Sequence, residues 1–210
     1  MSESDVRVCY GGAVAAADPL AAVLEGARTG DPPAVRRFLD AVAPAMLGAI
    51  RAVLGRSDRD LEDVLQDALV GVVQALPSFR GESTVLHFAR TVALRRALDQ
   101  RRRRARRGAE VDVDDEALLD ASGSPTASFV AAQRRRALRL VLAELRPEQA
   151  EAFAQRVLFG YSVEEIAKQA QVPLDTVKSR LRLAKAALRA RITNDPILLE
   201  LSETDDDDAP

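Results

Sequence analysis

The sequence has little of several residue types on which catalytic and secreted proteins depend. Its 210 residues include one cysteine, Cys9, one histidine, His87, and no tryptophan, and aromatic residues make up only 4%. A single cysteine excludes an internal disulfide and fits a reducing compartment. The sequence also shows no cluster of acidic residues within a pattern of apolar residues that would form a pocket. No combination of residues therefore indicates a nucleophile–base pair or a metal site. We therefore expect no enzyme, with no catalytic residues, no metal and no cofactor.

Long apolar runs and alternating strand patterns are also missing. No apolar run approaches the ~20 residues that a membrane-spanning helix needs. Residues 1–17 begin with acidic residues, unlike the positively charged start of a signal peptide. We therefore expect a cytoplasmic protein without membrane insertion. Hydrophobic residues make up 47% of the chain and recur with helical spacing, so the expected fold class is all-α.

The formal net charge of −2 conceals a strong segregation of charge. Residues 101–107 (RRRRARR) are almost entirely cationic, whereas residues 110–120 and 200–208 carry only acidic charges. This distribution is typical of a nucleic-acid binder with acidic segments near its basic ones. Two hypotheses remain open for the acidic tail: it folds back onto a basic segment as a DNA mimic, or it is a solubilising end.

Composition divides the chain into two small helical domains and three flanking segments. The linker is rich in Asp, Ala, Ser, Gly and Pro, which favours a flexible acidic connection. The expected segments are a flexible leader (1–18), a first helical domain (19–107), the linker (108–128), a second helical domain (129–193) and the acidic tail (194–210).

Proline and aspartate set the expected helix boundaries in the first domain. A Gly-Asp-Pro-Pro sequence at residues 30–33 is expected to separate two helical stretches. Asp58 or Asp60 is expected to start a third helix, and Pro77 to stop it. A short loop then leads into a fourth helix over residues 84–104.

Residues 161–191 predict a helix–turn–helix. Ser162 followed three residues later by Glu165 is a capping box that starts a short helix. A Val-Pro pair then breaks the run, and Asp175 or Thr176 is expected to cap a longer second helix. A short helix that holds a longer basic helix against a DNA groove is the geometry of helix–turn–helix proteins.

The second helix of this motif combines an apolar stripe with a row of cations. The apolar residues recur at four- and three-residue steps, so we expect them to be buried and the cations to face solvent. The stripe consists of Val177, Leu181, Ala184, Leu188 and Ile192, and the cations are Lys178, Arg180, Arg182, Lys185 and Arg189.

Three segments resemble the ECF (extracytoplasmic function) sigma factors of bacterial RNA polymerase. DLEDVLQDALVGVVQALPSFRGES (60–83) resembles the central part of the family's region 2, and ALRRALDQRRRRAR (93–106) resembles its basic end. Residues 142–189 resemble region 4 over nearly all its length. The resemblance implies a region 2 helical bundle and a region 4 helix–turn–helix domain. It implies a sigma factor that binds core polymerase, recognises −10 and −35 promoter elements and helps open DNA.

The resemblance also implies where core polymerase binds. In the family, a DxxQ[DE] motif docks on the clamp helices of the beta-prime subunit, and here this motif is Asp63, Gln66 and Asp67. Their spacing places all three on one helix face, opposite the apolar stripe. Residues 142–159 would help form the cradle that grips the beta flap. An anti-sigma factor, which many relatives have, is a further candidate partner.

Promoter DNA is the other partner that the resemblance implies. The loop at residues 79–83 corresponds to the part that captures a flipped −10 base, which costs a few kcal/mol to extrude; Phe79 is expected to pack beneath this loop. Expected −10 residues are Glu82, Ser83 and Thr84 at the base-reading rim, with Arg95, Arg96, Arg101, Arg102 and Arg103 on phosphates. Expected −35 residues are Thr176, Lys178, Ser179, Arg180 and Arg182.

Three positions depart from the family's usual pattern. The family usually has Trp at the position of Phe88, Asn at that of Arg95, and Gly at that of Gln171 in the helix–turn–helix turn. A positive φ at Gln171 would cost about 1 kcal/mol. His87, beside Phe88, is expected at the surface or on a DNA phosphate.

The main alternative is a helix–turn–helix transcriptional regulator with an N-terminal helical dimerisation or sensory domain. It would explain residues 161–191 but neither the segment at 60–83 nor the arginine run. It predicts a dimer on a palindromic operator, whereas a sigma factor acts as one copy on an asymmetric site.

Overall fold

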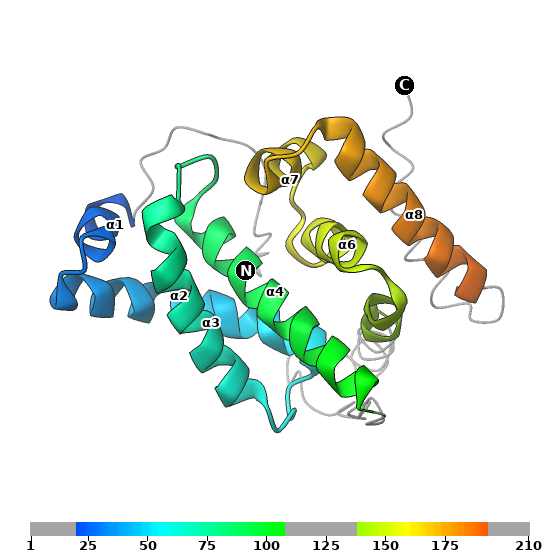
Figure 1. Cartoon of the computed structure of the whole chain (residues 1–210), viewed down its shortest axis with the longest axis horizontal. Helices are drawn as coiled ribbons and strands as arrows, with labels where there is room; N and C mark the ends of the chain where they lie inside the picture. Colours follow the sequence, from blue (N-terminus) through cyan, green and yellow to red (C-terminus); the bar gives the residue numbers. More distant parts are fainter. Residues whose placement is uncertain (1–19, 108–137, 193–210) are drawn as a thin grey trace, which may run out of the picture.

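The computed structural model describes residues 20–107 and 138–192 (Figure 1). Over these two ranges the regular structure is helical and no strand is present, which confirms the all-α prediction. None of the helices in these ranges is long and apolar enough to cross a membrane. The predicted leader, the linker and the acidic tail lie outside the described residues.

The first domain is a bundle built around one long helix, α2. Its buried face carries Phe38, Val42, Met46, Ile50 and Val53, which repeat at three- and four-residue steps. α2 packs against each of the other three helices, and α3 packs against α4. The elements are α1 (Ala21–Arg28), α2 (Pro32–Leu54), α3 (Leu61–Ala75), a 3₁₀ turn η1 (Leu76–Ser78) and α4 (Val85–Arg106).

The start of α2 corrects one predicted boundary. Pro32 and Pro33, expected to separate two helices, occupy the first two positions of α2. The Asp31 side chain caps the helix by accepting a 3.0 Å hydrogen bond from the Ala34 amide. Proline is suited to this place because a first-turn amide has no partner within the helix and the ring holds a helical φ.

The other predicted boundaries of this domain differ by a few residues. Asp60 precedes α3, but its side chain does not cap that helix; it accepts hydrogen bonds from Gln100 and Arg104 instead. α3 ends two residues before Pro77, which lies in η1. Thr84 caps α4 by accepting a 3.2 Å hydrogen bond from the His87 amide.

The second domain contains the predicted helix–turn–helix. Ser162 accepts from the Glu165 amide at 3.1 Å and Glu165 accepts from the Ser162 amide at 2.7 Å, which confirms the capping box. The second helix begins one residue before Asp175, so the prediction that Asp175 or Thr176 caps it is wrong. The helices are residues 138–144, α6 (Pro147–Phe159), α7 (Val163–Ala170) and α8 (Leu174–Ile192).

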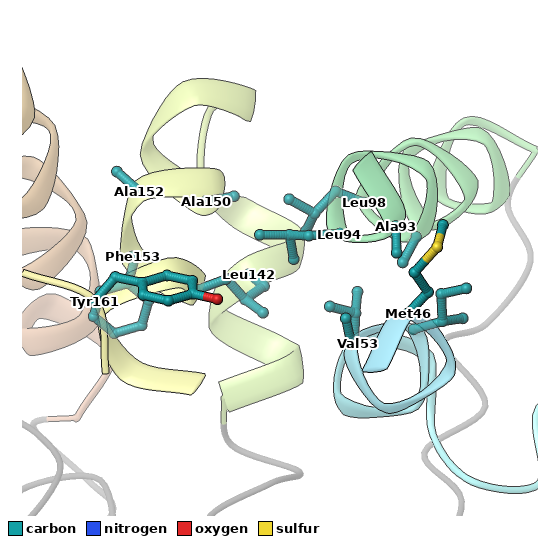
Figure 2. Close-up of a cluster of buried hydrophobic side chains, with 14 of the residues drawn as sticks. Met46, Val53, Ala93, Leu94, Leu98, Leu142, Ala150, Ala152, Phe153 and Tyr161 are labelled. Atoms are coloured by element: carbon teal, nitrogen blue, oxygen red, sulfur yellow. The ribbon is translucent and has the colours of Figure 1, made fainter. Parts of the chain in front are cut away.

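The two domains pack against each other through α4 and α6. Their buried apolar residues form one continuous cluster. Figure 2 shows Leu94 and Leu98 of α4 pointing toward Leu142 and Ala150 of the second domain. α4 is therefore shared: one side completes the first domain and another side faces the helix–turn–helix domain (Figure 1).

Candidate nucleic-acid and partner interfaces

α3 presents an acidic face that no other part of the described chain covers. Asp63, Gln66 and Asp67 are all exposed. Val64 and Ala68, each of which directly follows one of these acids in the sequence, are buried against the domain core. The side chains that the DxxQ[DE] spacing places together therefore do share an open helix face.

The loop between η1 and α4 borders a surface hollow of about 690 Å³. Phe79 packs beneath the loop, with its ring centroid 4.9 Å from that of Phe88, as the sequence led us to expect. Gly81 has a φ of 71°, which glycine adopts without strain. The hollow is lined by Leu24, Arg28, Pro77, Ser78, Phe79, Arg80 and Gly81. Its apolar residues suit a flat ring, and its two arginines suit a negatively charged group attached to that ring.

The three residues of the expected base-reading rim follow this hollow. Glu82 and Ser83 are partly buried, and Thr84 is exposed although its hydroxyl caps α4. Glu82 accepts a hydrogen bond from the Gln171 side chain, with Nε2 lying 3.3 Å from Oε1 and 3.5 Å from Oε2. The second domain thus reaches the rim through the turn of its helix–turn–helix.

The arginines of α4 divide among different environments. Arg95 turns to α6 and binds Glu151, whereas Arg96 lies across Gly71 of α3. Both are exposed, as is Arg103, and Arg102 forms an ion pair with Asp99 one turn earlier. The hydrogen bond with Glu151 raises the pKa of Arg95.

Arg101 differs from the expectation that it lies on a phosphate-binding surface. Its residue is 7% exposed, and Nη1 donates a 2.9 Å hydrogen bond to the Val53 carbonyl in the last turn of α2. Nε and Nη2 are buried with no hydrogen-bond partner. Burial lowers the pKa of Arg101 to about 10, so the group is still a cation at neutral pH. In this structure it holds the end of α2 to α4.

A carboxylate pair that sequence reasoning did not single out neutralises Arg104. Its guanidinium donates to Asp58 Oδ1 at 2.6 Å and to Asp60 Oδ2 at 3.0 Å. These bonds raise the pKa of Arg104, and the Arg104 hydrogen bond lowers that of Asp60. The available signal was two acids placed two residues apart just before α3, together with the arginine run at the end of α4. The anionic partner of the arginine run is thus partly supplied by the chain itself.

α8 buries the predicted stripe and exposes most of its cations. Val177, Leu181, Ala184 and Leu188 are buried against α6 and α7; the side chain of Ile192 lies outside the described set. Of the expected −35 residues, Lys178 and Arg182 are exposed, whereas Thr176, Ser179 and Arg180 are partly buried. Arg189 is also exposed, so a basic row follows the outer surface of this helix.

His87 is not on the surface, and this expectation was wrong. It is 3% exposed, its ring stacks on Tyr161 with centroids 3.6 Å apart, and Nε2 lies 3.2 Å from Gln155 Oε1. Burial lowers the pKa of His87, because the charged imidazolium loses hydration there. The sequence could not show this, because the covering residues come from the other domain.

Comparison with known proteins matches the same two parts of the chain. Residues 38–107 match the family model of sigma-70 region 2, and residues 135–188 match that of sigma-70 region 4. Together the two matches cover more than half of the chain.

Curated relatives and a solved structure are similar to this chain over much of its length. The RNA polymerase sigma-H factor of Pseudomonas aeruginosa is 28% identical in an alignment of 139 positions that covers 62% of this chain and 72% of that protein. The ECF RNA polymerase sigma-E factor of Escherichia coli K12 is 28% identical in an alignment of 141 positions that covers 63% of this chain and 74% of that protein. The structure of CnrH in complex with the cytosolic domain of CnrY has a similar fold, with a TM-score of 0.51, 20% identity, and coverage of 83% of this chain and 97% of that chain.

Proposed function

This chain belongs to the ECF sigma factors of bacterial RNA polymerase, and on that basis we propose which residues contact polymerase and which contact promoter DNA. As a sigma factor it directs core polymerase to promoters and takes part in transcription initiation. The main support for this function is that regions 2 and 4 occur in the same chain and in that order. A helix–turn–helix regulator would account for α7 and α8 alone and is not favoured. Sigma factors are generally initiation factors rather than enzymes.

Core polymerase is expected to dock on α3. Asp63, Gln66 and Asp67 are exposed on one face, where they can accept and donate hydrogen bonds to the beta-prime clamp helices. The region around α6 would contribute to the beta-flap contact. Partner recognition through exposed polar side chains on a rigid helix needs no rearrangement of the first domain.

The −10 element is expected to bind between the η1–α4 loop and α4. Glu82, Ser83 and Thr84 directly follow Gly81, the last residue that lines the hollow in which a flipped base would stack. Arg96, Arg102 and Arg103 would contact phosphates together with Arg95. Each phosphate that a cation neutralises on single-stranded DNA adds about 0.7 to the salt dependence of binding. Arg101 supports this surface from within, because it is buried.

The −35 element is expected to receive α8 in its major groove. Lys178 and Arg182 are exposed one turn apart, the arrangement that lets two side chains reach neighbouring base edges. Thr176, Ser179 and Arg180 flank them. Such a protein would be located in the cytoplasm, because RNA polymerase is there. An anti-sigma factor is a candidate regulator.

Transcription from a randomised promoter library tests this function without knowledge of the promoter. Core polymerase with the protein should yield transcripts whose templates share two different, asymmetric motifs. Lys178→Ala/Arg182→Ala should relax base preference only in the upstream motif, and Glu82→Ala only in the downstream motif. Transcripts that never exceed those of core polymerase alone, or enrichment of palindromes, would favour a regulator instead.

A further inference from the structure

One face of α4 is occupied by the second domain. His87, Leu94 and Leu98 on this face are buried, and Arg95 at its edge binds Glu151 of α6. We call the contact of these residues with the second domain the α4–α6 interface. The role of this interface in DNA binding rests on the proposed function, because it concerns Arg95 and Glu82, which we expect to contact −10 DNA.

Arg95 and Glu151 form the charged edge of the α4–α6 interface. Arg95 Nε lies 2.9 Å from both Glu151 oxygens, and Nη2 lies 2.7 Å from Oε1. The Glu151 side chain is 19% exposed and that of Arg95 is 50% exposed. A carboxylate that binds a guanidinium through several parallel hydrogen bonds fills the same donor positions as a phosphate would. Glu151 therefore occupies the donor groups of Arg95 that a DNA phosphate would use.

A buried polar chain continues from this edge into the centre of the interface. Gln155 Nε2 donates to Glu151 Oε1 at 3.3 Å, and Gln155 Oε1 faces His87 Nε2. Gln155 is 1% exposed. On the other side of His87, the Tyr161 ring stacks and its hydroxyl accepts a 3.3 Å hydrogen bond from Arg90. Buried polar groups that satisfy one another across a contact favour one arrangement over others.

The two ends of the interface meet the −10 residues and the shared apolar core. At one end the Gln171 side chain donates to Glu82 of the base-reading rim. At the other end Leu94 and Leu98 point toward Leu142 and Ala150 (Figure 2). α3, by contrast, lies on the side of α4 away from α6 (Figure 1), and the residues of its acidic face are exposed.

We propose that the α4–α6 interface is an intramolecular lock in which Glu151 holds the phosphate site of Arg95, so that −10 DNA and the second domain compete for one side of α4. The polymerase-binding face of α3 stays open in this closed state. Polymerase docking and −10 recognition are thereby separate events, and the second requires the domains to part. Because the coupling is reciprocal, closure weakens DNA binding by the same factor by which DNA weakens closure.

Glu151→Gln tests the lock with a matched control on the same helix. The variant keeps the shape of the side chain and removes the charge that holds Arg95. Glu148→Gln makes the same change in net charge at an exposed position of α6. The probe is a labelled single-stranded DNA of mixed sequence, titrated into the full-length protein at low salt. A partly exposed ion pair implies that Glu151→Gln binds DNA roughly two- to fivefold more tightly than Glu148→Gln.

Amide hydrogen exchange of the free protein supplies a readout that does not depend on DNA or polymerase. Glu151→Gln should speed exchange around His87 in α4 and around Gln155 in α6, and Glu148→Gln should not. The charge-swapped variant Arg95→Glu/Glu151→Arg should restore protection at these sites and bind DNA less tightly than Glu151→Gln. Equal DNA affinity and equal exchange for the two single variants would overturn the lock.

The lock and the proposed function can fail separately. If the protein does not bind core polymerase but the exchange results hold, the interface is a lock in a protein of another function. If polymerase binding by Glu151→Gln equals that of the wild type and exchange is unchanged, the function holds and the lock is wrong.

Discussion

Gln171 stands in the turn of the helix–turn–helix with a left-handed backbone, at φ 54° and ψ 43°. In the described residues it is the single non-glycine with a positive φ. The left-handed conformation costs an L-amino acid roughly 1–2 kcal/mol. Glycine avoids this cost but loses about 0.5–1 kcal/mol of stability, because its unfolded chain has more conformational freedom. Glycine at this position should therefore stabilise the fold by about 0.5–1 kcal/mol before side-chain contacts are counted.

The side chain of Gln171 offsets part of this gain. Its hydrogen bonds to Glu82 are long and exposed, and we assign them a few tenths of a kcal/mol. Gln171→Ala removes these bonds and keeps the strain, so it is the matched reference. The free energy of unfolding, from urea titration followed by circular dichroism, should be about 1 kcal/mol higher for Gln171→Gly than for Gln171→Ala. The corresponding rise in Tm is about 2–4 °C.

The ordering of the three proteins decides the matter. Strain at a left-handed residue predicts that Gly is the most stable, Gln intermediate and Ala the least. If Gly were equal to Ala, or below it, the left-handed turn would not be strained and the reasoning would be refuted.

Three further predictions concern other parts of the fold. Ser162→Ala removes the acceptor for the Glu165 amide and should lower the free energy of unfolding by about 1 kcal/mol in urea titration, whereas an unchanged midpoint would contradict the cap. Arg104→Ala leaves the buried Asp58 carboxylate without its partner and should lower the free energy of unfolding by roughly 2–3 kcal/mol. Arg103→Ala, at an exposed position, should lower it by less than about 0.5 kcal/mol, and similar losses for the two variants would contradict the ion-pair network. His87, which faces Arg90, Glu165, Gln155 and Tyr161, has a pKa below its ordinary 6.5, so protonation favours the separated domains. The interface should be fully stable above about pH 6.5 and should weaken as the pH falls below it. At about pH 5.5, amide exchange in α4 should then be faster than the pH dependence of intrinsic exchange predicts. Slower exchange would contradict the expected direction of this pH dependence.

Local signals predicted what depends on residues close in sequence. The Ser162–Glu165 capping box and the α8 stripe from Val177 to Leu188 appear in the structure as expected. Each rests on helix geometry within one or two turns, where side-chain spacing determines which residues share a face. The acidic face of α3 followed from the same logic.

Expectations failed where a partner comes from a distant part of the chain. His87 is buried because Tyr161 and Gln155 cover it from the other domain. Arg101 is buried because the end of α2 offers it a carbonyl. A run of arginines looks uniform in sequence, but packing decides which of them face solvent. The prediction that Pro32 and Pro33 separate two helices failed for a local reason, because proline is as compatible with the first turn of a helix as with the end of one.

Binding to core RNA polymerase tests the central claim most directly, because no promoter need be known. Wild type should bind core polymerase one-to-one, and Asp63→Ala/Gln66→Ala should weaken that binding at least tenfold, about 1.4 kcal/mol. Glu25→Ala on α1, which removes an exposed carboxylate away from α3, should bind as the wild type does. No binding by the wild-type protein, or equal binding by all three, would contradict docking of polymerase on the acidic face of α3.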